Sequence, residues 1–164
     1  MFNRFMPDDN FSRMIQLATE FFDTKNDPSQ LSIDETVIER LHRIHPSTMG
    51  ERTGENGPIA WTIVIPTTNA LMKQFIEGAI GEQELMELTI QQRNFDAVYL
   101  CSAMVLPEHR GKGLAKQLLC SSIRAIINDH SIRHLFYWAF SREGDALAQG
   151  TAKELQLPLL KRKE

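Results

Sequence analysis

The sequence is poor in cysteine, in net positive charge and in long apolar runs. Its only cysteines, Cys101 and Cys120, exclude a disulfide framework and a cysteine-rich zinc site. The 18 basic and 21 acidic residues give a net charge of −3, whereas a dedicated binder of nucleic acid or anionic membranes needs a basic excess. No apolar run reaches membrane-spanning length, and the first ten residues contain no apolar signal core. We therefore expect a cytoplasmic protein without a nucleic-acid or membrane partner.

The remaining composition is that of a globular protein. Hydrophobic residues make up 42% of the chain and charged residues 24%, both ordinary values. A chain of 164 residues is long enough for one hydrophobic core. We therefore expect a single domain over residues 1–164, with no internal repeat.

Apolar periodicity and breaker residues divide this chain into elements. Helical spacing predicts a helix at 10–23, and a capping box of Ser32 and Glu35 begins a second helix that runs through Ile44. Residues 45–58 hold three glycines and two prolines and are expected to form a long polar loop. Apolar and β-branched runs then predict three strands. Helical spacing predicts one helix between the second and third strands and another after the third. The strands are expected at 59–66, 97–106 and 132–140, and the helices at 112–128 and 143–155; residues 157–164 close the chain.

Residues 67–93 predict a helical insertion before the strand at 97–106. The insertion contains two short helices, of which Asn69 caps the first, and the segment from Gly78 to Gly81 separates them. The whole pattern predicts an α/β (α+β) fold, in which helices flank a mixed central sheet.

A turn rich in glycine and positive charge follows the uncharged strand at 97–106. Strand, turn, helix and strand in succession predict a βαβ unit, with the turn at the carboxyl end of a central strand, where such sheets bind ligands. The helix beginning there offers about four free backbone N–H groups and the positive end of its dipole. Gly111 and Gly113 let an anion approach the backbone, and Arg110 and Lys112 add charge. These features predict a phosphate site.

A purely structural interpretation of this turn is the alternative, in which the glycines only sharpen it and the basic side chains are solvated. Two familiar phosphate motifs are absent. The chain has no G-x-x-x-x-G-K-[ST] sequence, and Lys116 stands where a dinucleotide fold would need its third glycine.

The hexapeptide Arg110-Gly111-Lys112-Gly113-Leu114-Ala115 resembles the [QR]-x-x-G-x-[GA] signature of the GNAT superfamily of N-acetyltransferases. The stretch around it, MVLPEHRGKGLA, is similar to the strand-to-helix passage of that family, and the order of elements is also similar. The resemblance implies an acyltransferase of the EC 2.3.1 class that moves the acetyl group of acetyl-CoA to an amine of a small molecule or peptide. It also implies that the six signature residues surround the cofactor diphosphate.

By the same resemblance, three residues before the turn contact the pantetheine arm through their backbone: Met104, Val105 and Leu106. An ordinary core role for their side chains is compatible with this contact. In the family a neutral amine attacks the thioester directly, which requires a base and often an acid for the leaving thiolate. Many members place a tyrosine in the last helix as that acid, but the matching residue here is Ala152. No acid is therefore assigned.

The candidate bases follow the last expected strand or lie on it. Glu143 is the best-placed carboxylate, although it could equally be a helix-start charge, and Tyr137 is the second candidate. Tyr99 is expected in the core, while Glu108 and His109 are expected to be solvated. His42 and His45 form an isolated H-x-x-H pair that we expect at the surface or in a loop, so no metal site is predicted.

The acceptor pocket departs from the family pattern, because we expect neither a strand hairpin before residue 97 nor strands after the last helix. The pocket is therefore either reshaped or completed by another subunit, as in a homodimer. Acidic clusters hint at a cationic acceptor. Two alternatives to an enzyme remain. The chain could be a non-catalytic acyl-CoA-binding module, or an interaction protein that works through its helical insertion and has a vestigial cofactor site.

Overall fold

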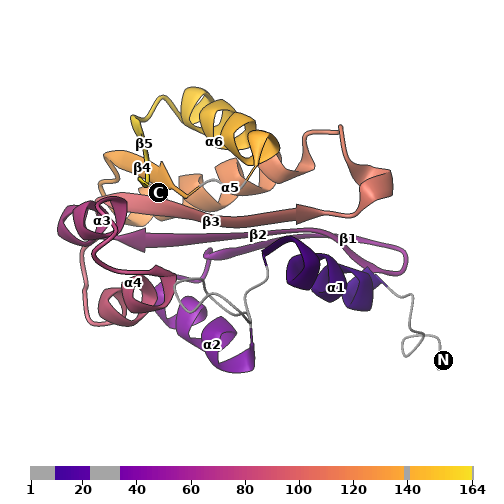
Figure 1. Cartoon of the computed structure of the whole chain (residues 1–164), viewed down its shortest axis with the longest axis horizontal. Helices are drawn as coiled ribbons and strands as arrows, with labels where there is room; N and C mark the ends of the chain where they lie inside the picture. Colours follow the sequence, from indigo (N-terminus) through magenta and orange to yellow (C-terminus); the bar gives the residue numbers. More distant parts are fainter. Residues whose placement is uncertain (1–9, 23–33, 139–140, 164) are drawn as a thin grey trace.

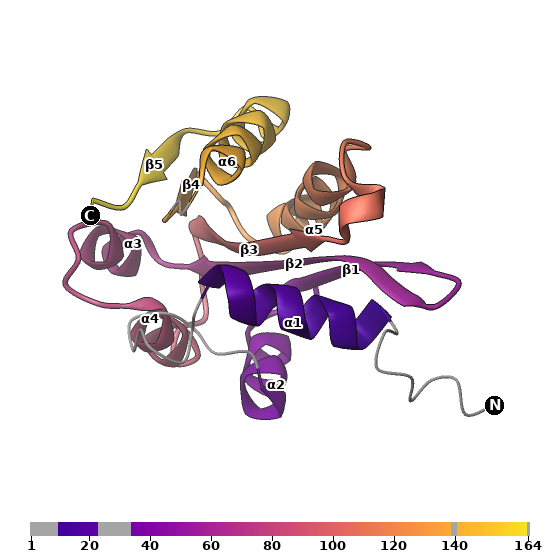
Figure 2. The ribbon, with the colours of Figure 1, turned by 45° about the vertical axis from the view of Figure 1, so that its right-hand side comes forward.

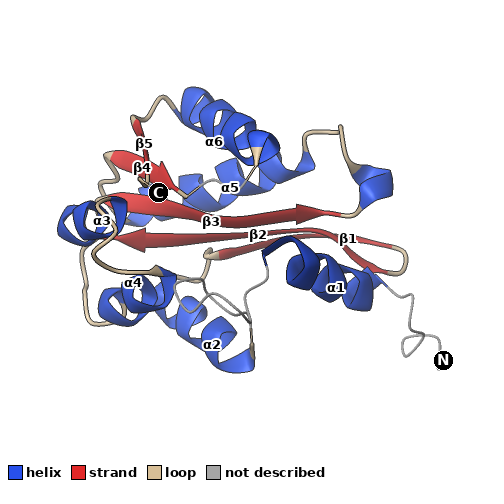
Figure 3. Cartoon of the chain, in the orientation of Figure 1, coloured by secondary structure: helices blue, strands red, loops and turns tan. Residues whose placement is uncertain are grey.

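The computed structural model describes residues 10–22, 34–138 and 141–163. Its strands form a single mixed sheet in the order β1-β2-β3-β4-β5. The pairs β1–β2 and β2–β3 are antiparallel, whereas the pairs β3–β4 and β4–β5 are parallel (Figure 3). The central strand β3 is therefore the point at which the sheet changes from antiparallel to parallel. The strands are β1 (Met49–Gly54), β2 (Gly57–Thr67), β3 (Ala97–Val105), β4 (His134–Tyr137) and β5 (Leu159–Lys161).

Helices cover both faces of this sheet (Figure 1). One face carries α1 (Asn10–Phe22), α2 (Glu35–Ile44), α3 (Asn69–Ile76) and α4 (Glu82–Thr89). The other carries α5 (Leu114–Asp129), which connects β3 to β4, and α6 (Arg142–Leu155). The predicted mixed α/β sheet flanked by helices is confirmed, as is the parallel pairing of the strands on either side of α5.

Each face has its own core. Aromatic side chains of α3, β3 and β4 stack on the first face, with the rings of Phe75 and Tyr99 4.7 Å apart and those of Tyr99 and Phe136 5.1 Å apart. On the second face, aliphatic residues of α5 such as Ile123 and Ile126 are fully buried against the sheet. Each such side chain contributes about 1.5–3 kcal/mol by leaving water. The sheet is thus fixed from both sides. No helix in the described segments is long and apolar enough to cross a membrane.

The helical insertion is confirmed. The structure places α3 and α4 within residues 67–93, separated by a turn in which Gly78 has a positive φ of 84°. The capping residues differ from the prediction. Thr68, rather than Asn69, caps α3 by accepting a hydrogen bond from Leu71 N–H, and Asp34 caps α2. The predicted capping residue Ser32 lies outside the described residues.

Two strands were missed by the sequence prediction. The expected loop over 45–58 contains β1, which pairs with β2 as an antiparallel hairpin closed by Gly54 and Gly57 (Figure 2). This edge strand is largely exposed, so it has no apolar alternation that could reveal it. The closing segment contains β5, whose three residues pair with β4. The hairpin expected to be absent before β3 is therefore present, and one strand follows the last helix.

Candidate active site

The turn between β3 and α5 has the conformation of an open anion cradle. It begins with the single 3₁₀ turn η2 (Pro107–His109) and continues through Gly111 and Gly113, with positive φ values of 80° and 74°. Only glycine adopts this left-handed region without strain. A Cβ at Gly111 would meet no atom within 4 Å, so the space above the turn is open.

A row of backbone donors lies along this turn. The N–H groups of residues 111–116 have no hydrogen-bond acceptor within the described part of the chain. The first bonded amide is that of Gln117, which donates to the Gly113 carbonyl at 3.0 Å. No side chain caps α5, because its N-cap residue is Gly113. The turn thus combines unsatisfied donors with the positive end of the helix dipole.

The two basic side chains of the turn differ in their surroundings. Lys112 is exposed and makes no hydrogen bond or ion pair with any described residue, so its ammonium group is available to a ligand. Arg110 is also exposed, but its Nε donates a hydrogen bond to the Val105 carbonyl at 3.0 Å, which ties it to the end of β3. Of the other signature residues, Leu114 is buried and Ala115 is half-buried.

The half of β3 that leads to the turn is open on one side. Pairing with β4 covers only residues 97–100, so among the described residues the stretch 102–105 pairs only with β2. A β-bulge marks the boundary, because Leu100 and Ser102 face the consecutive residues Val64 and Ile63, which leaves Cys101 as the extra residue. An extended ligand arm could therefore pair with the free edge of this strand. Met104 and Leu106 are buried and Val105 is half-buried.

A buried acidic group that the sequence prediction missed lies beside the bulge. Glu82, the first residue of α4, is only 5% exposed. Its carboxylate accepts a hydrogen bond from the Tyr99 hydroxyl, and Cys101 Sγ lies 3.8 Å from the same oxygen. Burial first, and then the charge of Glu82, raise the pKa of Tyr99 and the pKa of Cys101 well above their usual values. Both groups are therefore neutral donors at physiological pH.

The two predicted catalytic residues lie apart from this group. Tyr137 pairs in register with Leu100, and its hydroxyl donates to Asp145 of α6 at 2.8 Å. Burial and the bond to Asp145 raise the pKa of Tyr137 to about 12. Glu143 is exposed in the first turn of α6 and has no hydrogen bond or ion pair with a described residue. Their catalytic roles stay predictions, and Tyr99 lies in the core as expected, with no exposed surface.

Three other predicted positions are fixed by contacts or burial. Glu108 is not merely solvated, because Arg13 of α1 binds both of its carboxylate oxygens at 2.7 Å. The Arg13 hydrogen bonds lower the pKa of Glu108 to about 2. His45 is buried rather than at the surface, with Nε2 2.7 Å from Asp129 Oδ2. Ala152, at the position where the signature resemblance implies a tyrosine, is buried against α5 and the sheet.

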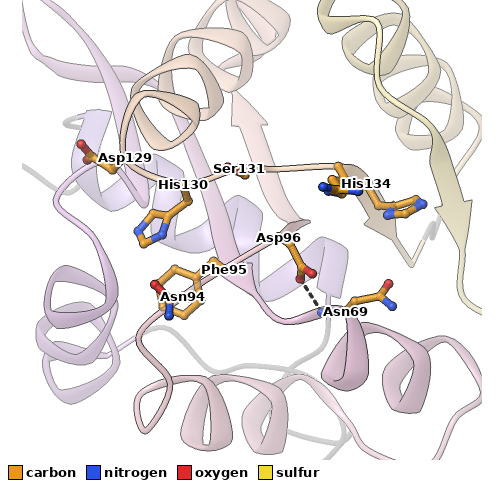
Figure 4. Close-up of a pocket in the computed structure, with 9 residues that line it drawn as sticks. Asn69, Asn94, Phe95, Asp96, Asp129, His130, Ser131 and His134 are labelled. Carbon is orange, nitrogen blue, oxygen red and sulfur yellow. Dashed lines mark hydrogen bonds between the residues drawn. The ribbon is translucent and has the colours of Figure 1, made fainter.

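A hollow lies at the opposite end of β3 and β4 from the glycine turn (Figure 4). It has a volume of about 690 Å³ and is lined by residues that precede β3 and β4, together with Asn69 at the start of α3. In it, Asp96 Oδ1 accepts a hydrogen bond from the Asn69 backbone N–H at 2.6 Å. This hollow is separate from the glycine turn, which follows the carboxyl end of β3.

No protein-family model matches the sequence, and no curated protein is significantly similar to it. Among solved structures, the chain is similar to the crystal structure of the ribosomal-protein-alanine N-acetyltransferase from Brucella melitensis biovar Abortus 2308. The two share 14% sequence identity over 84% of this chain and 83% of the other, with a TM-score of 0.40.

Proposed function

We propose that the chain is an acetyl-CoA-dependent N-acetyltransferase. The observation that supports this function best is the row of six unsatisfied backbone N–H groups at residues 111–116, next to the open half of β3. The row fits a diphosphate, and the free strand edge fits an amide-containing arm such as pantetheine. Acetyl-CoA carries both groups in this order. The signature resemblance at residues 110–115 points to the same ligand.

The residues of the turn and of β3 would divide the work of holding this ligand. The N–H groups and Lys112 would bind the diphosphate through charge-assisted hydrogen bonds, each worth about 1.5–3 kcal/mol. The backbone of residues 104–106 would direct the arm along β3 toward the bulge at Cys101. Bound acetyl-CoA would supply the thioester that a neutral amine attacks. The reacting group would thereby lie near the end of β4, where Tyr137 pairs in register with Leu100.

The acceptor is proposed to be an amine of a small molecule or peptide, in line with the acidic groups of the chain. Glu82 is buried beside the bulge, whereas Glu143 is exposed in α6, so a bound amine would reach Glu143 more easily than Glu82. Glu143 stays the proposed base because solvent reaches it. Tyr137 is proposed only as a proton donor, since a pKa of about 12 keeps it protonated.

Thermal unfolding with acetyl-CoA, CoA and ATP added separately tests the cofactor. A ligand at about 100 times its dissociation constant should raise the melting temperature of a chain this size by about 5–11 °C. We expect this rise with acetyl-CoA and CoA but not with ATP. An equal rise with ATP would indicate an unspecific phosphate site, and no rise with any of the three would contradict the proposal.

A non-catalytic acyl-CoA-binding module is the second candidate, favoured by Ala152 at the position of the family's acid. The two candidates differ in turnover. Release of free CoA thiol in the presence of a panel of small and peptide amines, compared with acetyl-CoA alone, would support the enzyme. Binding without amine-dependent release from any member of the panel would support the module.

A further inference from the structure

An ion pair connects the first helix to the proposed phosphate turn. Helix α1 lies beneath the end of the sheet toward which β3 points (Figure 1). The guanidinium group of Arg13 on this helix binds Glu108 of η2. Both nitrogen–oxygen distances are 2.7 Å, and the side chains are 34% and 48% exposed. This bidentate geometry joins residues that are 95 positions apart in the chain.

The carboxylate of Glu108 is a negative charge close to a turn that is proposed to bind a negatively charged diphosphate. Glu108 precedes Gly111 by three residues, so the two Cα atoms are at most about 11 Å apart, which is about one Debye length at 0.1 M ionic strength. An unpaired carboxylate at that distance would repel a diphosphate on the turn. It would also offset one of the two positive charges that Arg110 and Lys112 provide.

The ion pair is not needed to hold α1 on the sheet. Met14 is fully buried in a cluster with Met104 and Leu106, and Leu17 packs against the same cluster. Asn10 also bonds through its side chain to the Gly57 carbonyl, at 3.4 Å. These contacts dock α1 without Arg13, so removing its side chain should leave the helix in place.

We propose that Arg13 sets the affinity of the turn for a diphosphate ligand by neutralising Glu108, so that α1 acts on the site through this ion pair. The proposal rests on the proposed function, because it takes the diphosphate to be that of CoA. Arg13 is a positioning residue in this scheme, since it acts through Glu108 and touches no ligand.

The test is a double-mutant cycle with CoA as the ligand and isothermal titration as the measurement. At about 0.01 M ionic strength, Arg13→Met should weaken CoA binding about three- to tenfold, and this loss should vanish at about 1 M, where the Debye length is about 3 Å. Glu108→Gln alone should not weaken binding. The double variant should bind at least as tightly as the wild-type chain, because the repelling charge is gone.

Three controls separate charge compensation from other effects. Arg43→Met removes an equal charge from α2, where Arg43 pairs with Glu39 at 2.9 Å, and should leave CoA affinity unchanged. Pantetheine, which lacks phosphate, should bind the wild-type chain and Arg13→Met equally. Circular dichroism should show that each variant is folded.

Each other outcome counts against a defined part of the scheme. If both single variants weaken binding equally and the double variant does not recover, the pair acts by geometry alone and charge compensation is wrong. If Arg13→Met binds CoA as the wild-type chain does, Arg13 has no role at the site. If the wild-type chain binds no CoA, the proposed function itself fails, and this proposal fails with it.

Discussion

The hydroxyl group of Tyr137 donates a hydrogen bond to Asp145 Oδ1, 2.8 Å away, and so joins the end of β4 to the first turn of α6. The ammonium group of Lys161 on β5 lies 3.1 Å from the same oxygen. The bonds from Tyr137 and Lys161 lower the pKa of Asp145, while burial and the bond to Asp145 raise the pKa of Tyr137 to about 12. One carboxylate therefore links three elements at the edge of the sheet.

The first prediction concerns alkaline pH. The chain has two tyrosines, Tyr99 and Tyr137, and both have a raised pKa in the folded state. A tyrosine in the unfolded chain has a pKa of about 10, so the stability that Tyr137 contributes is complete below about pH 10 and is lost as the pH rises toward 12. We expect almost no tyrosinate absorbance from the folded protein at pH 10.5, against ionisation of more than half in denaturant. A tyrosinate absorbance that reaches half of its full amplitude near pH 10 in the folded protein would contradict this prediction.

The second prediction concerns the thiol beside the bulge. The charge of Glu82 helps to raise the pKa of Cys101, so Glu82→Gln should lower that pKa and increase the rate of alkylation at pH 8. The rate is measured in a Cys120→Ser background, which leaves a single thiol. Glu84→Gln, an exposed position on the same helix, is the matched control and should not change the rate. An unchanged rate in Glu82→Gln would show that the carboxylate does not govern this thiol.

The third prediction separates backbone strain from ligand binding at Gly113. Both Gly113 and Gly78 have positive φ, so alanine at either position should destabilise the fold by about 1–2 kcal/mol. Only Gly113→Ala should also weaken CoA binding, because its methyl group enters the proposed phosphate cradle. Urea unfolding and CoA titration of both variants measure the two effects. Equal CoA affinity in both variants would remove Gly113 from the site.

The fourth prediction concerns the close approach of β1 to its neighbours. A Cβ on Gly50 would lie 2.5 Å from Thr62 Oγ1 and 3.3 Å from Ser122 Oγ, so Gly50→Ala should lower stability by about 1–3 kcal/mol. In a Thr62→Ala background the loss should shrink. Gly150→Ala is the contrasting control. Gly150 lies within α6, and a Cβ there would be 3.6 Å from Lys116 Cδ of α5, an ordinary van der Waals contact. Alanine there should stabilise the helix by about 0.5–1 kcal/mol. Urea unfolding measures all four variants.

The sequence was sufficient to predict the elements with strong local patterns. The buried strand β3, the glycine turn and α5 were predicted because apolar runs, glycine and helical spacing are all local signals. The edge strands were missed because β1 is largely exposed and β5 has three residues. Neither one carries the periodicity that burial on one side imposes.

The contacts around the candidate site could not be predicted for a different reason. Arg13 and Glu108 are 95 positions apart, and Glu82 and Tyr99 are 17 apart on different elements. In the sequence, Glu82 has no feature that sets it apart from the acids near it, because its burial depends on how α4 packs against the sheet. Such pairings arise from tertiary structure, which leaves no local pattern in either segment.

The extra residue in β3 changes which side chains face which layer. Before the bulge, Tyr99 points toward the layer of α2, α3 and α4, yet beyond it the even-numbered residue Met104 packs under α1 on the same side. The strand therefore switches phase at Cys101 and supplies one face with odd positions first and even positions afterwards. Deleting that single residue would restore a regular ladder and leave Met104 facing α1, whereas a regular ladder that kept Cys101 would turn Met104 toward α5. The attachment of α1, and with it the ion pair to η2, thus depends on an irregularity one residue long.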